Sequence, residues 1–377
     1  MSNDFSGQDI NVNEEKGEKT LDTGHLVFRA GQKAFAMIKD GGLEPDNVKV
    51  VAGAAGGPKW FVLRHLDEAI FLSWMKHREA PLFLIGSSIG SWRFAAVSQN
   101  DPADAIALFE YAYMHQKYTE RPSAEDVSRA SRIILDRFIN DSKADSILNH
   151  PFLRLNIMAV RSRFSVSSDR KASLAIGLAG AYLSNLFNRE FLGCFFERAL
   201  FYDSREKPPF LNMNDFPLRK IPLLKDNLKD ALLASGSIPF VMTGVKDIKG
   251  APKGVYRDGG VIDYHFDIPF LNHEEAIVLY PHYLDRLIPG WMDKKLPWRK
   301  PKSDHMDHVL LVFPSQSFIE SLPYGRIPDR VDFKAFFKRD EERISYWKKV
   351  VHQSRVLGDE FIDVVESGKI RDVVLPL

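Results

Sequence analysis

A serine flanked by glycines, between a buried strand and a helix, is the feature that most constrains the fold of this chain. The apolar residues 82–85 enter the motif GSSIG, in which Ser88 stands between Gly86 and Gly90, and helix-compatible residues follow. A strand that turns so sharply into a helix holds its central residue in a strained conformation, and the glycines remove Cβ atoms that would clash there. Ser88 is therefore expected to project its hydroxyl beside the N–H groups that open the helix.

A second glycine-rich turn lies upstream, after the apolar residues 48–52. It reads GAAGGPKW over residues 53–60, and Pro58 suits the first turn of the helix predicted beyond it. A Walker loop is excluded because Gly-Lys followed by Ser or Thr is absent, and a dinucleotide loop because G-x-G-x-x-G is absent. The N–H groups of Gly56 and Gly57 are then the expected donors of an oxyanion hole. A tight turn that closes the helix onto the strand is the alternative.

A third segment places a carboxylate at the end of a short strand. Residues 255–257 have strand character, and Asp258 follows them directly before Gly259 and Gly260. The two glycines allow the backbone to lie close to neighbouring segments. A buried Asp with raised proton affinity can accept the proton of a serine hydroxyl directly, so that no third residue is needed. The alternative interpretation is an ordinary Asp-Gly turn.

These segments, in this order, resemble the patatin-like phospholipase family. A fourth, DALLASGSIPFVMTGV at residues 230–245, is similar to the family's helix that precedes the catalytic Asp, and the resemblance spans about residues 47–280. It implies a serine acyl hydrolase of lipid metabolism, a phospholipase or lipid esterase that degrades lipids through an acyl-enzyme on Ser88. Asp258 would be the general base, with oxyanion donors at Gly56 and Gly57. Lys59 occupies the place of the family's basic residue.

The chain also departs from the family pattern. Pro58 interrupts the glycine-rich loop, and Val261 follows the Asp-Gly-Gly motif where many members continue with asparagines. The altered loop leaves open a non-catalytic member of the same fold that binds lipid or protein. A histidine base is a second alternative, because imidazole is the stronger base near neutral pH. Five histidines follow Asp258 in the order that a Ser-Asp-His triad requires: His265, His273, His282, His305 and His308.

Composition narrows the class of protein and its partners. The 377 residues are 45% hydrophobic and 12% aromatic, which is enough for a large core. The formal net charge of +1 gives no general attraction to nucleic acid, and no metal-ligand spacing or cofactor motif is present. Cys194, the single cysteine, is expected to be a buried small hydrophobe in a reducing cytoplasm.

The organisation along the chain predicts a disordered polar tail over residues 1–23, an acyl hydrolase domain over 24–320 and a packed helical extension over 321–377. No apolar run is long enough to span a bilayer, and the nearest, residues 174–187, is interpreted as a packed helix. Basic residues and two tryptophans share residues 291–302, which are either a solvated loop or a peripheral contact with an anionic membrane.

Hydrophobic periodicity predicts alternating helices and strands. Helices are expected at residues 26–39, 103–117, 124–139, 171–189 and 333–366, and strands at 155–160, 276–280 and 308–313, besides those of the motifs above. This alternation predicts a three-layer α/β/α fold. The family resemblance implies that its central sheet is mostly parallel.

Overall fold

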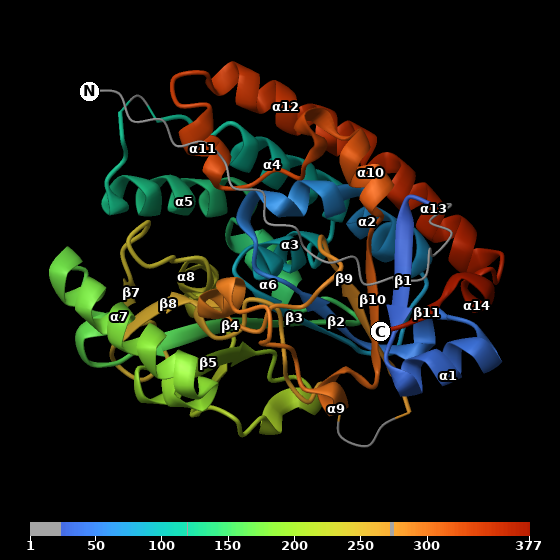
Figure 1. Cartoon of the computed structure of the whole chain (residues 1–377), viewed down its shortest axis with the longest axis horizontal. Coiled ribbons are helices and arrows are strands. Elements are labelled where there is room, and N and C mark those ends of the chain that lie inside the picture. Colours follow the sequence, from blue (N-terminus) through green and yellow to red (C-terminus); the bar gives the residue numbers. More distant parts are fainter. Residues whose placement is uncertain (1–23, 119, 272–274) are drawn as a thin grey trace, which may run out of the picture.

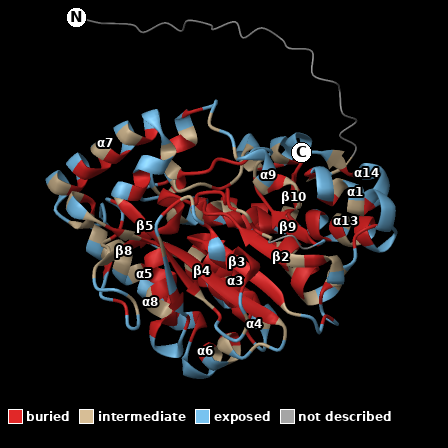
Figure 2. Cartoon of the chain, turned by 90° about the horizontal axis from the view of Figure 1, so that it is seen from below, coloured by how far each residue is buried: buried red, intermediate tan, exposed pale blue. Residues whose placement is uncertain are grey.

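The computed structural model describes residues 24–118, 120–271 and 275–377 (Figure 1). The tail expected over residues 1–23, and His273, lie outside this part of the chain. Helices flank a central sheet on both sides. The strands in its middle are almost wholly buried, whereas the helices around it carry exposed outer faces (Figure 2).

The strands of the described residues join into one sheet. They are β1 (Leu26–Ala30), β2 (Val48–Gly53), β3 (Leu82–Ser87), β4 (Leu153–Ser162), β5 (Phe196–Tyr202), β6 (Leu218–Pro222), β7 (Val245–Lys246), β8 (Val255–Asp258), β9 (Ile277–Pro281), β10 (Val309–Pro314) and β11 (Leu375–Pro376). Their order is β11-β1-β10-β9-β2-β3-β4-β5-β6, and β8 pairs with β4 and β7 beside this path. Pairings along the path are parallel except β1 with β10 and β4 with β5.

The α-helices cover this sheet. They are α1 (Gln32–Gly41), α2 (Arg64–Glu68), α3 (Ile89–Val97), α4 (Pro102–Met114), α5 (Ala124–Phe138), α6 (Asp141–Leu148), α7 (Lys171–Phe187), α8 (Lys225–Ser235), α9 (Ser303–Met306), α10 (Gln316–Ser321), α11 (Val331–Ala335), α12 (Asp340–Gln353), α13 (Arg355–Glu366) and α14 (Ile370–Val373). The predicted three-layer α/β architecture with a mostly parallel central sheet is thus confirmed.

Most expected elements are present with ends shifted by a few residues, but the helix predicted at residues 26–39 was wrong at its start. Residues 26–30 form β1, which pairs antiparallel with β10. Its side chains alternate between buried and half-buried positions. A Cβ on Gly31 would overlap the carbonyl of Met306, so a glycine separates this strand from α1. The apolar residues of the short strand and of the helix after it together match a helical spacing, so the sequence predicted one continuous helix.

Cys194 was also wrongly assigned, because it is exposed. It ends the 3₁₀ turn η5 (Arg189–Cys194), in which the neighbouring Leu192 takes the buried position. The sequence predicted one apolar run here, whereas the chain turns at this point and enters β5.

The C-terminal helices pack directly on the glycine-rich segment near the middle of the sheet. α12 contacts the 3₁₀ helix η2 (Gly57–Leu63), and α13 contacts α2. The last strand, β11, lies parallel to β1 at the sheet edge. Residues from both ends of the chain therefore share one continuous core.

Candidate active site

Ser88 stands at the turn between β3 and α3 in a strained backbone conformation. Its φ of 54° and ψ of −125° lie in a region that residues with a Cβ rarely adopt. A Cβ on Gly86 would overlap the backbone of Ser91, and one on Gly90 would overlap the carbonyl of Gly53. The two motif glycines are thus required by close backbone contacts.

Ser235, at the end of α8, holds this turn in place. Its hydroxyl accepts the N–H of Ser88 at 2.8 Å and donates to the carbonyl of Met158 in β4 at 2.6 Å. Ser91 adds a bond from its hydroxyl to the Ser88 carbonyl at 2.7 Å. Ser235 belongs to the segment 230–245, which was singled out from the sequence. This segment therefore contacts the turn that carries Ser88.

Strand register brings Asp258 to Ser88. Ser87 lies opposite Met158 in the β3–β4 pair, and Asp258 lies opposite Ala159 in the β4–β8 pair. The Ser88 hydroxyl donates to Oδ2 of Asp258 at 2.9 Å, and the N–H of Gly260 donates to Oδ1 at 2.7 Å. Both side chains of this Ser-Asp pair belong to residues only 6% exposed.

Burial raises the pKa of Asp258 above its usual value, while the positive charge of Arg330 opposes this shift. A carboxylate in such surroundings holds a proton more readily than one in water. Close packing also explains the glycines that follow it. A Cβ on Gly259 would overlap the carbonyl of Met158, and one on Gly260 would come within 3.0 Å of Ala55.

The glycine-rich loop lies next to this pair, because β2 and β3 are parallel neighbours whose carboxyl ends share one edge of the sheet. Gly57 has a φ of +57°, which favours glycine. Ala55, Gly56 and Gly57 line a small recess together with Ser88 and Asp258. Within the described part of the chain, no backbone acceptor takes the N–H of Gly56 or Gly57, so both remain available to a ligand. Pro58 fits the first turn of η2, as expected.

Two tyrosines, Tyr264 and Tyr283, hold the glycine-rich loop through hydrogen bonds to the backbone of Ala55. The N–H of Ala55 donates to the carbonyl of Tyr264 at 2.9 Å, and the hydroxyl of Tyr283 donates to the carbonyl of Ala55. Nδ1 of His265 accepts the N–H of Ile288 at 2.8 Å, which leaves the ring proton on Nε2, 2.9 Å from the Tyr283 hydroxyl. His265 therefore acts as a donor to Tyr283.

No histidine described by the structure contacts Ser88. Both ring nitrogens of His265 are occupied as above, and burial holds its pKa well below its usual value. His282 binds backbone groups of Leu284, His305 binds the carboxylate of Asp267, and His308 binds a backbone carbonyl. The described geometry thus favours a serine and aspartate pair over a histidine triad.

Three basic residues lie at or near the recess. Lys59 forms an ion pair with Asp329, and burial lowers its pKa to about 8. The ammonium of Lys294 lies 3.9 Å from the ring centroid of Tyr264, and burial lowers its pKa to about 7. Arg330 borders the recess and has no hydrogen-bonded or ion-paired acid among the described residues. It packs against Gly57, where a Cβ would lie 3.0 Å from its Cγ.

Arg330 and Lys294 were missed as site residues by sequence reasoning. Lys294 belongs to the basic tryptophan segment that the sequence singled out, whereas Arg330 lies in an ordinary charged stretch with no motif around it. Tyr283 likewise carries no sequence signal, because its role depends on where β9 ends relative to the glycine-rich loop.

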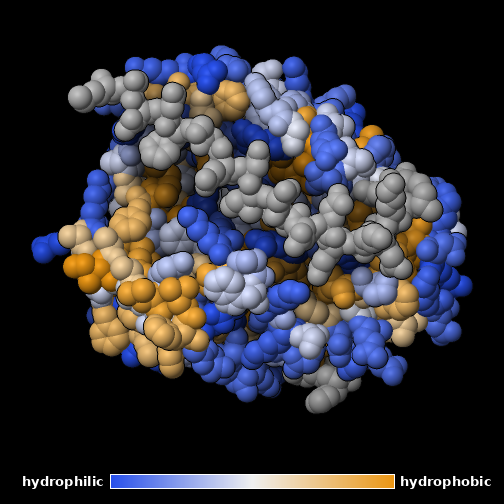
Figure 3. All heavy atoms as spheres, viewed as in Figure 1, coloured by the Kyte–Doolittle hydropathy of each residue, from blue (hydrophilic) through white to orange (hydrophobic). Residues whose placement is uncertain are grey.

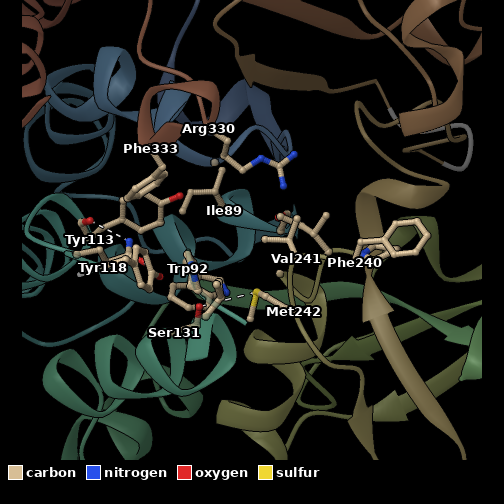
Figure 4. Close-up of a pocket in the computed structure, with 18 of the residues that line it drawn as sticks. Ile89, Trp92, Tyr113, Tyr118, Ser131, Phe240, Val241, Met242, Arg330 and Phe333 are labelled. Carbon is tan, nitrogen blue, oxygen red and sulfur yellow. Dashed lines mark hydrogen bonds between the residues drawn. The ribbon is translucent and has the colours of Figure 1, made fainter. Parts of the chain in front are cut away.

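An apolar cavity of about 480 Å³ opens beside Ser88 (Figure 4). Most of its wall comes from four separate parts of the chain: the start of α3, the α4–α5 region, the segment after α8, and the segment around α11. The principal apolar side chains are Ile89, Trp92, Val241, Met242, Phe333 and Phe337. This volume and lining suit a small apolar ligand or part of a larger one.

Within the described residues, no group of three or more His, Cys, Asp or Glu side chains is arranged to hold a metal ion. The recess next to Ser88 holds one carboxylate, Asp258. The groups that its walls contribute to chemistry are therefore a hydroxyl, a carboxylate, free N–H groups and the guanidinium of Arg330.

No family model matches this sequence, and neither does any curated protein. Two solved structures resemble the fold at 10% sequence identity. VipD from Legionella pneumophila matches 62% of this chain and 50% of its own length with a TM-score of 0.26. Human GIVD cytosolic phospholipase A2 matches 90% of this chain and 63% of its own length with a TM-score of 0.32. The chain thus spans less than two thirds of either protein.

Proposed function

We propose that this chain is a serine acyl hydrolase of the patatin-like type, which cleaves carboxylic esters of lipids through an acyl-enzyme on Ser88. The single observation that carries this proposal is the bond of 2.9 Å between the hydroxyl of Ser88, at a strained strand-to-helix turn, and the buried carboxylate of Asp258. A strained serine beside a base is the arrangement that nucleophilic catalysis requires.

In the proposed reaction, Asp258 accepts the proton of Ser88 while the serine oxygen attacks the ester carbonyl. The developing negative charge on the carbonyl oxygen is stabilised by the N–H groups of Gly56 and Gly57, which have no other acceptor among the described residues. The alcohol then leaves with a proton from Asp258. Water attacks the acyl-enzyme, with Asp258 again as the base, and releases the fatty acid and free Ser88.

The cavity and the positive charge at the recess favour a particular class of ester. The apolar cavity next to Ser88 suits an acyl chain. Arg330 places positive charge at the recess where the ester would react, and it has no acid partner among the described residues. An ester that also carries an anionic group, as a phospholipid does, satisfies both features.

Residues 24–320 form the hydrolase domain in this proposal, and residues 321–377 are an extension packed on it. We propose a cytoplasmic protein that reaches its substrate at the membrane surface. A protein of the same fold that binds lipid without hydrolysing it is the competing function.

Labelling with a fluorophosphonate tests the proposal, because this reagent reacts with an activated serine. We expect an adduct on Ser88 by peptide mass spectrometry, and none in Ser88→Ala. Asp258→Asn should lower the turnover of p-nitrophenyl esters by roughly 10²- to 10⁴-fold, the usual contribution of a general base.

Ser87→Ala is the matched control, because Ser87 is the neighbouring buried serine and its hydroxyl has no hydrogen-bond partner in the described part of the chain. It should label and turn over esters like the wild type. Absence of the Ser88 adduct in folded wild-type protein would refute the hydrolase and favour the lipid-binding alternative.

A further inference from the structure

Helix α7 exposes an apolar face to solvent. Residues 172–187 contain no charged side chain. One side of the helix packs on the protein through Leu174, Leu178 and Ala181, as the sequence predicted for a packed helix. The outward side remains apolar too, with the residues Ile176, Leu183 and Phe187 being 71%, 57% and 85% exposed.

A helix on the surface of a globular protein normally presents polar residues outward. Here Tyr182, Leu186 and, just beyond the helix, Phe191 extend the apolar surface. In the space-filling view this surface is the orange area at the lower left, where Figure 1 places α7 (Figure 3). A continuous exposed patch of this kind marks an interaction site. We call it the α7 face: residues 176, 182, 183, 186, 187 and 191.

The α7 face is joined to the candidate active site at both ends of the helix. Before α7, the carboxylate of Asp169 accepts the N–H of Gly244, which follows the cavity-lining residues 238–242. Near the end of α7, the side chain of Arg299 donates to the carbonyl of Asn185 at 2.7 Å. That bond attaches the basic tryptophan segment to the helix.

Both flanking segments also expose apolar side chains: Phe240 and Val241 beside the cavity, and Trp298 in the basic segment. A partner that covers the α7 face together with these segments would reach the cavity entrance.

The charge around the α7 face is mainly positive. Arg170 and Lys171 occupy the start of the helix, where an acidic residue would be favoured by the helix dipole, and no acid lies in the first turn. Lys295 and Lys300 are exposed in the basic segment. Within the described residues, no acid forms an ion pair with Lys171, Lys295 or Lys300. Glu190, just after the helix, is an exposed acid in this region. Apolar side chains rimmed by unpaired cations complement an anionic lipid surface.

The dimensions of α7 fit a helix that lies on a membrane. Its 17 residues span about 25 Å, and no helix in the described ranges has the length and hydropathy needed to cross a bilayer. We propose that the α7 face docks onto an anionic lipid surface, with the helix lying along the interface and the cavity entrance held against the lipid. This inference rests on the proposed lipid-ester substrate, which must pass from a membrane into the cavity.

The test measures binding without hydrolysis. The full chain carrying Ser88→Ala is sedimented with phosphatidylcholine vesicles that contain or lack phosphatidylglycerol. We expect binding that phosphatidylglycerol strengthens. Leu183→Glu with Phe187→Glu should weaken it at least about tenfold, because two exposed apolar side chains lose their contact with lipid and two negative charges are added.

Val373→Glu, which places one acid at an exposed apolar position on α14 away from the α7 face, is the control and should bind like the parent. In the wild-type background, Leu183→Glu with Phe187→Glu should keep its turnover of a short soluble ester. If the wild-type protein does not hydrolyse the short soluble ester, the proposed hydrolase function is refuted, whatever the sedimentation result.

Two results would overturn the docking proposal. Equal sedimentation of the parent and the double variant would show that the α7 face does not contact lipid. A dimer in solution that the double variant dissociates, with vesicle binding unchanged, would assign the face to a second copy of the chain.

Discussion

The electrostatics of one residue set the pH dependence expected of the reaction. Asp258 can accept a proton from Ser88 only when it is ionised. Burial raises its pKa, and Arg330 lowers it again. The rate should therefore rise with pH as Asp258 ionises, and the position of this acidic limb depends on Arg330.

Removal of the Arg330 charge in Arg330→Gln should raise the pKa of Asp258 further and move the acidic limb of kcat/KM to higher pH. The measurement is a pH profile with a short neutral ester, which does not itself depend on a cationic subsite. Arg330→Lys should keep the limb near its original position. Arg339→Gln, which removes an exposed arginine farther along the chain, should leave it unmoved. An unshifted limb in Arg330→Gln would show that this guanidinium does not act on the base.

At this scale the sequence is informative where local backbone geometry demands particular residues. Gly86 and Gly90 could be identified because a Cβ at either position would overlap neighbouring backbone. Asp258 could be identified because two glycines follow it. Arg330 could not, because its place depends on how a distant C-terminal segment folds over Gly57, and a lone arginine in a charged stretch has no pattern of its own.

Among the elements, the loop after β2 is held by a chain of hydrogen bonds from another part of the sheet. Tyr283, just past β9, donates to the carbonyl of Ala55 and accepts from Nε2 of His265. Its ring also packs against Gly56, where a Cβ would come within 2.7 Å of the hydroxyl. Tyr283 is thus a positioning residue for the proposed oxyanion donors.

Tyr283→Phe keeps the ring and removes the bond to Ala55. We expect kcat for a soluble ester to fall on the order of tenfold with little change in KM, because the loop would stabilise the transition state less well than before. The rate of fluorophosphonate labelling on Ser88 should fall in parallel. Tyr280→Phe is the matched control, since this buried tyrosine is also hydrogen-bonded to the backbone, but its hydroxyl accepts the N–H of Phe266 away from this loop. An unchanged kcat in Tyr283→Phe would contradict the positioning role.

Element types were predictable wherever one hydrophobic period ran long enough. The buried runs at β2 and β3 and the capped helix α5 have unambiguous patterns. Residues 26–39 have no single pattern, because a strand of five residues and a helix of ten residues are separated only by Gly31. β1 is a strand because β10 pairs with it, and that partner lies nearly 300 residues away in the sequence.

At the scale of the whole molecule, the C-terminal residues complete the core and the cavity together. Trp347 of α12 is fully buried against Phe61 of η2, with ring centroids 5.1 Å apart. Its indole N–H donates to the buried carboxylate of Asp332 at 2.9 Å. Asp332 also accepts the N–H of Asp329, so these contacts fix the segment that carries Arg330. Residues of the segment after position 321 thus supply both packing and one wall of the cavity.

This arrangement predicts that residues 24–320 and 321–377 unfold as one unit. Trp347→Ala should lower the free energy of unfolding by about 3–5 kcal/mol, the usual cost of truncating a fully buried tryptophan, and keep a single transition in urea. Trp298→Ala removes an exposed tryptophan and should leave stability nearly unchanged. Fluorophosphonate labelling of Ser88, followed across the same titration, should disappear with the same midpoint as the circular dichroism signal. A shared core cannot lose one half and keep the other intact. Labelling that survives a first transition would therefore contradict this prediction and show that residues 24–320 hold the Ser-Asp pair without the C-terminal helices.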